Sequence, residues 1–133
     1  MKKVAFVCTH NSCRSQMAEA FLKALGPDVA ISFSAGTKKY KAVKKRPIKV
    51  MKELNINMDG FYPKLVDTLP KDLDILVTMG CGVDCPYVLS KHREDWGLTD
   101  PSGKSLEEHR KTRNIINDKV LELIKKIKEG YYN

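Results

Sequence analysis

The sequence lacks the long apolar run that a membrane-spanning helix requires. Hydrophobic residues make up 42% of the chain and charged residues 30%, and no stretch approaches the roughly 18 apolar residues of a membrane span. The first residues are basic and then apolar, as in a signal peptide, but the apolar part is short and no small-residue cleavage site follows. We therefore expect a cytoplasmic globular protein without a membrane partner.

Internal repeats, low-complexity tracts and an interdomain linker are also absent from the sequence. A chain of 133 residues can enclose one compact core but not two domains of ordinary size. We expect a single domain over residues 1–133, with a monomer as the default state.

Acidic residues are too few to balance the basic ones. Lys and Arg number 24 against 16 Asp and Glu, which gives a formal net charge of +8, so the surface should attract anions. Eight of the 16 residues from Thr37 to Lys52 are basic. Such a run is either a nucleic-acid footprint or a solvated lysine-rich face. We favour the solvated face and expect no nucleic-acid partner, because neither interleaved aromatic residues nor a nucleic-acid-binding motif accompanies the run.

Cysteine is scarce, and its spacing is informative. The chain has Cys8, Cys13, Cys81 and Cys85, which without a secretory signal are expected to be reduced and to serve catalysis or metal binding. Zinc frameworks usually show Cys-x2-Cys knuckles, whereas these pairs are separated by four and three residues. We therefore expect no zinc site. The loop around the second pair is too polar and glycine-rich for a core segment.

Apolar runs and helical periodicities alternate along the chain, which predicts an α/β fold with a parallel sheet and right-handed crossovers. In such a fold, ligands bind beyond the carboxyl ends of the strands. The residue pattern predicts strands over 3–8, 29–35, 73–79 and 92–98, and helices that end near 25, span 47–55 and span 105–128.

The segment Cys8-Thr9-His10-Asn11-Ser12-Cys13-Arg14-Ser15 lies between a predicted strand and a predicted helix. Successive backbone N–H groups at such a place can surround a tetrahedral oxyanion. Cys8 at the mouth of this loop is the candidate nucleophile, because the N–H dipoles favour its thiolate. Arg14 can hold two anion oxygens in a bidentate contact. Ser15 can donate a hydrogen bond that helps the thiolate leave.

The other residues of this loop are expected to surround the oxyanion through their backbone. Asn11 and Ser12 can hold a strained loop by hydrogen bonds between side chain and backbone. Cys13 is expected to be an inert packed thiol. In the competing reading, Cys8 is a small core residue at the end of a strand and Arg14 a solvated helix residue. The expected oxyanion-binding set comprises Thr9, His10, Asn11, Ser12, Cys13 and Arg14.

Residues 4–19, from Val-Ala-Phe-Val-Cys to Gln-Met-Ala-Glu, resemble the start of the low-molecular-weight protein tyrosine phosphatase superfamily, and most of all its arsenate reductases. The likeness continues through Ser34-Ala35-Gly36, Thr78-Met79-Gly80-Cys81 and residues 94–101. This resemblance implies a three-layer α/β/α domain with a four-stranded parallel sheet. It also implies that Asp100, which precedes Pro101, is a general acid. Without the resemblance, an ordinary Asp-Pro turn would be the favoured reading.

The resemblance leaves two activities to separate. A phosphatase needs Cys8, Arg14 and Asp100, whereas an arsenate reductase for arsenic detoxification also needs thiols that become a disulfide. Cys81 and Cys85 favour the reductase, with Cys81 attacking the adduct on Cys8 and Cys85 forming the final Cys81–Cys85 disulfide; their order could be reversed. The alternative is a low-molecular-weight tyrosine phosphatase, but the aromatic residue that commonly follows Asp-Pro in that branch is replaced here by Ser102.

The resemblance also implies an oxyanion substrate, arsenate or a phosphate-like anion, and a thiol reductant. Thioredoxin is favoured, because a close cysteine pair forms a small disulfide ring that it could reach. A low-molecular-weight thiol is the alternative, because the Met-Gly-Cys-Gly run followed by Cys-Pro also resembles the branch that uses one. No organic cofactor is expected. Asn11, Glu19 and Ser34 match positions at which some family members bind potassium.

Overall fold

The computed structural model describes residues 1–80 and 88–133. Strands and helices alternate in it up to residue 78 as the hydrophobic pattern predicts, and among the described residues the last two strands follow one another without a helix between them. In chain order, the elements are β1 (Lys2–Cys8), α1 (Arg14–Leu25), β2 (Ala30–Gly36), α2 (Lys45–Lys52), the 3-10 helix η1 (Val66–Thr68), β3 (Leu73–Thr78), β4 (Ser90–Asp95) and α3 (Leu106–Lys128).

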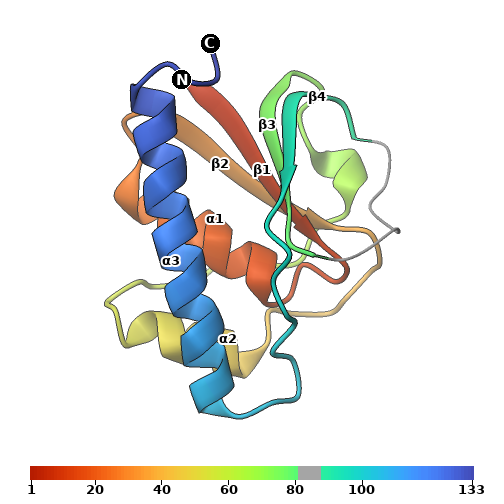
Figure 1. The fold of residues 1–133 in the computed structure, drawn as a ribbon. Helices are drawn as coiled ribbons and strands as arrows, with labels where there is room; N and C mark the ends of the chain where they lie inside the picture. The colour runs from red at the N-terminus through yellow and green to blue at the C-terminus, as the bar shows by residue number, and fades with distance from the viewer. Residues whose placement is uncertain (81–87) are drawn as a thin grey trace.

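The four strands form one parallel sheet in the order β2-β1-β3-β4 (Figure 1). The predicted α/β class with a four-stranded parallel sheet is therefore confirmed. β1 is an inner strand, and its residues Val4–Val7 are almost completely buried, which explains the continuous apolar run. Because the strands are parallel, their carboxyl ends meet at one edge of the sheet, where Cys8, Gly36, Thr78 and Asp95 lie.

The two faces of the sheet are covered differently. α1, α2 and α3 share the larger core with one face, where Phe6 of β1 packs with Met17 and Phe21 of α1 and Ile116 of α3. Within the described ranges, the other face is covered by η1 and its flanks, and its buried residues are Ala5, Val7, Leu73 and Leu76. Figure 1 shows α1, α2 and α3 together on one side and η1 apart from them. Replacing Phe21 with alanine would cost about 3–5 kcal/mol of stability.

α3 begins where the sequence predicts, and a side chain along it joins it to α2. The Ser105 Oγ accepts a hydrogen bond from the Glu108 backbone N–H at 3.2 Å, as expected for an N-cap. Further along α3, Arg113 donates to the Val50 carbonyl and to Glu53, which ties α3 to α2. No helix in residues 1–80 or 88–133 is both long enough and apolar enough to cross a membrane.

The fourth strand starts and ends earlier than predicted. The sequence predicts residues 92–98, but β4 covers Ser90–Asp95. β4 is an edge strand, so its alternate charged side chains point to solvent and give it little apolar signal. Trp96 and Leu98, which the predicted strand included, pack against the core beyond β4, and Gly97 between them has a φ of +59° that a strand cannot contain.

Candidate active site

Residues 9–13 form a short loop between the carboxyl end of β1 and the first residue of α1. The loop is packed into the protein: Asn11, Ser12 and Cys13 are at most 3% exposed. Gly36 at the end of β2 lies directly beneath it. A Cβ atom on Gly36 would come within 2.7 Å of the Thr9 carbonyl oxygen and 2.9 Å of the Asn11 nitrogen. Glycine is therefore required there for the sheet and the loop to approach.

Carbonyl groups of this loop accept hydrogen bonds from neighbouring segments of the chain. The Thr9 oxygen accepts from the Thr37 and Lys38 amides at 2.8 and 2.9 Å, and the Ser12 oxygen accepts from the Lys44 amide at 3.0 Å. In a planar trans peptide the N–H points opposite to the C=O. The N–H groups that follow Thr9 and Ser12 therefore point away from residues 37–44.

The N–H groups of residues 9–13 donate no hydrogen bond to any group in the described part of the chain. They precede α1, whose N-terminus carries the positive end of the helix dipole. Buried donors without protein partners at a helix N-terminus form an anion-binding site. The arrangement is suited to a tetrahedral oxyanion bound next to Cys8, as the sequence predicts.

Cys8 and Ser15 meet at the base of this loop. The Cys8 Sγ and Ser15 Oγ atoms are 2.8 Å apart, and the Asn11 Nδ2 donates to the same Ser15 oxygen at 2.8 Å. Because that oxygen already accepts from Asn11, its own hydrogen is free to point at the sulfur. Ser15 is thus placed to donate to a Cys8 thiolate and stabilise its negative charge.

Asn11 is held in an unusual conformation by hydrogen bonds from Gln16 and Lys64. Its φ is +51°, in the left-handed region that asparagine tolerates better than most residues. Its Oδ1 accepts from Gln16 Nε2 and from the Lys64 backbone N–H, each at 2.9 Å. Gln16 Nε2 also lies 2.9 Å from the Tyr62 carbonyl oxygen. Asn11 therefore connects the loop to α1 and to the segment that follows α2.

Arg14, the first residue of α1, is 5% exposed. Its Nη1 donates to the Met79 and Leu98 carbonyl oxygens, both at 2.8 Å. These carbonyls follow β3 and β4, so the guanidinium joins two strand ends to the loop. With Nη1 engaged, Nη2 and Nε donate no hydrogen bond to another described residue, and they form the fork that can hold two oxygens of an anion.

Asp100 lies beside this guanidinium, with its Oδ2 3.8 Å from Arg14 Nη2 and its side chain about half exposed. Burial raises the pKa of Asp100, but hydrogen bonds from Ser102 and the positive charges of Arg14 and Lys44 outweigh it, so the pKa lies below its usual value. The carboxyl is thus ionised at neutral pH, and a negatively charged ligand next to Arg14 would raise its proton affinity.

The remaining loop residues contribute differently. Cys13 is 3% exposed, and burial, followed by the negative charges of Asp100 and Cys8, raises its pKa to about 12. A thiol that stays protonated at neutral pH is a poor nucleophile, as expected for a packed thiol. The His10 ring packs against the Tyr40 ring in a tilted arrangement with 5.2 Å between centroids, so its side chain turns towards the segment after β2.

Glu19 and Ser34, two expected potassium ligands, do lie together. Ser34 Oγ donates to Glu19 Oε1, and Asn11 is joined to the same region through Lys64. The Glu19 carboxylate, however, is already paired with two ammonium groups, those of Lys23 and Lys64. These oxygens therefore do not fit an added cation.

Cys81 and Cys85 lie outside the described residues. Gly80, the residue before them, has a φ of +88° and donates its N–H to Asp95 Oδ1 at 2.9 Å. Thr78 Oγ1 donates to the same Asp95 oxygen at 2.8 Å. Gly80 is also close to Leu98, where an added Cβ would lie 2.8 Å from the backbone nitrogen. Gly80 thus lies next to the carbonyl groups that hold Arg14.

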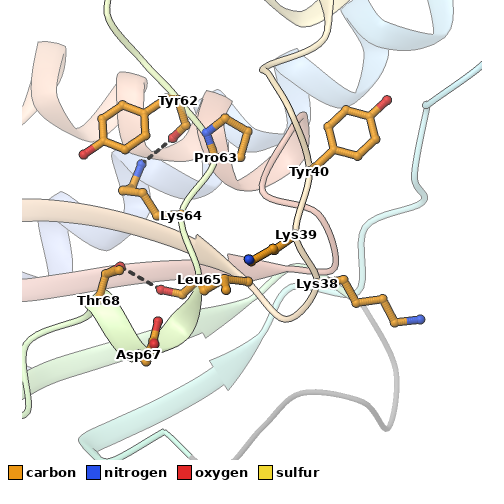
Figure 2. A pocket seen from close by; sticks show the side chains of 9 residues that line it. All are labelled: Lys38, Lys39, Tyr40, Tyr62, Pro63, Lys64, Leu65, Asp67 and Thr68. Carbon is orange, nitrogen blue, oxygen red and sulfur yellow. Dashed lines mark hydrogen bonds between the residues drawn. The ribbon is translucent and has the colours of Figure 1, made fainter.

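The basic run from Thr37 to Lys52 borders the anion loop. Seven of its eight basic side chains are exposed, and Lys44 is partly buried. On α2, the basic residues face solvent while Pro47, Val50 and Met51 are buried, as predicted for a solvated face. The segment after β2 and residues 62–68 enclose a pocket of about 330 Å³ beside the loop, lined by Lys38, Tyr40, Tyr62 and Lys64 among others (Figure 2).

Several groups of the site carry no sequence signature. The Met79 and Leu98 carbonyls that hold Arg14 are backbone atoms, so no residue type marks them. Gln16 and Lys64 are also absent from the site residues that the sequence predicts. Gln16 could have been noted because it directly follows the anion loop and Ser15, but Lys64 is 53 residues from Asn11 along the chain.

Comparison with known proteins adds an independent observation. The family described as low molecular weight phosphotyrosine protein phosphatase matches residues 3–132. The "Glutaredoxin arsenate reductase" of Synechocystis sp. is 40% identical over 131 residues, which cover 96% of this chain and 99% of that protein.

Solved structures agree with this match. "An arsenate reductase in the phosphate binding state" superposes with a TM-score of 0.87 at 40% identity, covering 96% of this chain and 99% of that one. A thioredoxin-dependent arsenate reductase from Corynebacterium glutamicum has a TM-score of 0.80 at 28% identity and covers 98% of this chain and 63% of that one.

Proposed function

Because the chain belongs to the low molecular weight phosphotyrosine protein phosphatase family, and its relatives at about 40% identity are arsenate reductases, we propose that it reduces arsenate to arsenite. The observation that carries the proposal is the arrangement around Cys8. Its thiol is hydrogen-bonded to Ser15, and the same loop holds inward-pointing backbone N–H groups and the buried side chain of Arg14. This arrangement suits a tetrahedral oxyanion, and arsenate has the shape and charge of phosphate.

Arsenate is bound by the N–H groups of residues 9–14 and by the Arg14 fork. Arg14 Nη1 is held by two carbonyl oxygens, so the guanidinium is oriented before the anion arrives. Pre-orientation lowers the entropic cost of binding and aims the donors at oxygens that gain charge during the reaction.

The first chemical step is attack of the Cys8 thiolate on arsenic. A sulfur–arsenic bond forms and one arsenic–oxygen bond breaks, and the departing oxygen leaves as water after it takes a proton. Asp100 is the proton donor: the bound dianion opposes its ionisation, so that it can collect a proton and pass it to the leaving oxygen. Ser15 stabilises the sulfur before attack through its hydrogen bond.

The second step transfers two electrons. The thiolate of Cys81 attacks the Cys8 sulfur, so a disulfide forms, the sulfur–arsenic bond breaks, and its electron pair leaves with arsenic as arsenite. Cys85 then attacks Cys81, which releases Cys8 and leaves a Cys81–Cys85 disulfide. Cys13 takes no part, because its raised pKa keeps it a thiol.

An external thiol reduces the disulfide and completes the cycle. The names of relatives support two donors: one structure is of a thioredoxin-dependent arsenate reductase, and one relative is called a glutaredoxin arsenate reductase. Thioredoxin suits a small disulfide ring between Cys81 and Cys85. Turnover measured with the thioredoxin system alone and with glutathione and glutaredoxin alone assigns the donor.

The proposal is tested by arsenite release with a thiol reductant present, compared with hydrolysis of p-nitrophenyl phosphate by the same protein. We expect arsenite formation to dominate, to be abolished in Cys8→Ser, and to stop after one cycle in Cys85→Ser while phosphate-ester hydrolysis in Cys85→Ser is unchanged. Efficient ester hydrolysis without arsenite formation by either donor would assign a phosphatase instead.

A further inference from the structure

Glu19 is a buried carboxylate surrounded by donors. It lies on α1 with 4% of its surface exposed, and Ser34 of β2 donates to its Oε1. Lys23, one turn further along α1, is paired with its Oε2. The Lys64 Nζ is 3.7 Å from its Oε1. A buried carboxylate needs such partners, because an unpaired buried charge is strongly destabilising.

Lys64 is bound to the site through three parts of the residue. Its side chain is 20% exposed, and its Nζ donates to the Tyr62 carbonyl at 2.8 Å and lies 4.9 Å from the centre of the Tyr62 ring. Figure 2 shows the ammonium turned back towards Tyr62. Its backbone N–H donates to Asn11 Oδ1 at 2.9 Å, and its carbonyl accepts from Gly36 at 2.7 Å.

These contacts connect Lys64 to the nucleophile through a short chain of hydrogen bonds. The Lys64 amide holds Asn11 Oδ1, Asn11 Nδ2 donates to Ser15 Oγ, and Ser15 lies 2.8 Å from Cys8 Sγ. A shift of Lys64 would therefore move Asn11, whose left-handed backbone sets the path of the anion loop.

We propose that Lys64 supplies the cation of this site: its ammonium neutralises Glu19 while its backbone N–H holds Asn11 in place, so that the anion loop works without potassium. Lys64 is thus a positioning residue that acts through Asn11 and Ser15. The proposal concerns the oxyanion site on which the proposed function rests.

Charge explains why Lys64 and a metal ion exclude one another. Two ammonium groups already face the single carboxylate of Glu19, and a third cation would be repelled by both. Asn11 Oδ1 already accepts hydrogen bonds from two protein donors, and Glu19 Oε1 accepts one from Ser34. Burial, and then the neighbouring Lys23, lowers the pKa of Lys64, while Glu19 opposes the shift. Glu19 thus favours the charged form of Lys64 at this site.

The test compares Lys64→Ala with two other variants. Alanine removes the ammonium and opens space beside Glu19, whereas Lys64→Met removes the charge but keeps the length of the side chain. Lys125→Ala is the matched control, because Lys125 is exposed in the last turn of α3 and far along the chain from the loop. Each protein is titrated with inorganic phosphate and melted in potassium chloride and in choline chloride at equal ionic strength.

We expect wild type and Lys125→Ala to have the same phosphate affinity and Tm in both salts. In choline chloride, Lys64→Ala should bind phosphate about tenfold more weakly, the change that ~1.4 kcal/mol produces. Potassium should recover most of that affinity and raise its Tm, whereas Lys64→Met should lose affinity without recovery. Potassium stimulation of wild type, or a response of Lys64→Ala no larger than that of wild type, would overturn the proposal.

Phosphate binding and melting do not require arsenate reduction. Failure of this proposal can therefore be distinguished from failure of the reductase assignment, which arsenite release tests separately.

Discussion

The Ser15 hydroxyl lies 2.8 Å from the Cys8 sulfur, across the loop that precedes α1. The same hydroxyl oxygen accepts a hydrogen bond from Asn11, which leaves its own proton available to a thiolate at the sulfur. Cys8 and Ser15 are seven positions apart in the sequence, and the turn of the anion loop brings them together. Nucleophile and thiolate stabiliser are thus held in place by one buried loop.

Replacing Ser15 tests that contact. Ser15→Ala removes the donor to the Cys8 thiolate, and hydrogen bonds to charged groups contribute about 1.5–3 kcal/mol. We expect alkylation of Cys8 by iodoacetamide at neutral pH to slow about tenfold or more, measured by peptide-resolved mass spectrometry. Ser15→Thr keeps the hydroxyl and serves as the control; an unchanged rate in Ser15→Ala would show that the hydroxyl does not act on the sulfur.

Replacing Arg14 with lysine separates charge from geometry. Lysine keeps the positive charge, but it cannot donate to two carbonyl oxygens and at the same time hold two oxygens of an anion. We expect Arg14→Lys to weaken inorganic phosphate binding by about tenfold to a hundredfold, because it loses charge-assisted hydrogen bonds of ~1.5–3 kcal/mol. Arg46→Lys, on the exposed face of α2, should bind like wild type. Equal affinities in both variants would contradict the role of the fork.

Asp100 should affect binding and turnover in opposite directions. Its lowered pKa means that it is an anion at neutral pH, 3.8 Å from the Arg14 Nη2. Asp100→Asn removes this competing charge, so phosphate should bind about threefold to tenfold more tightly, while arsenite formation falls because the proton donor is lost. Asp118→Asn, exposed on α3, is the control for charge alone. Weaker phosphate binding in Asp100→Asn would contradict this assignment.

The link between α2 and α3 should weaken in acid. Hydrogen bonds from Arg110 and Arg113 lower the pKa of Glu53 to about 2, from 4.5. A lowered folded-state pKa stabilises the folded state above pH 4.5, and this contribution is lost as the pH falls towards 2. We therefore expect wild type to melt at a higher temperature than Glu53→Gln at pH 7, with the gap closing between pH 4.5 and 2. A gap that persists at pH 2 would show that the charge is not responsible.

The chemistry near Cys8 could be predicted because it is local in sequence. A buried strand, a short polar loop and a helix bring Cys8, Arg14 and Ser15 to one point, whatever the rest of the fold does. The parallel sheet could be predicted for the same reason, because the apolar pattern of each strand and helix lies within a short stretch of sequence. The predicted bounds of β4 were too late in the sequence, because an edge strand with alternate charged residues has little apolar signal.

Groups brought in from distant segments could not be predicted. Arg14 is held by backbone carbonyls of Met79 and Leu98, and carbonyls have no residue identity. Lys64 reaches Asn11 and Glu19 only because residues after α2 return to the end of β2. The potassium expectation came from the resemblance of Asn11, Glu19 and Ser34 alone, and it could not include the ammonium groups that the fold brings to Glu19.

Thiol counting under anaerobic conditions tests the central claim most directly. Fully reduced protein is mixed with excess arsenate and no external thiol, and the free thiols lost and the arsenite released are counted per chain. The relay predicts two thiols lost for each arsenite, the same result in Cys13→Ala, and neither change in Cys8→Ser. Arsenite released without thiol loss, or two thiols lost in Cys8→Ser, would contradict it.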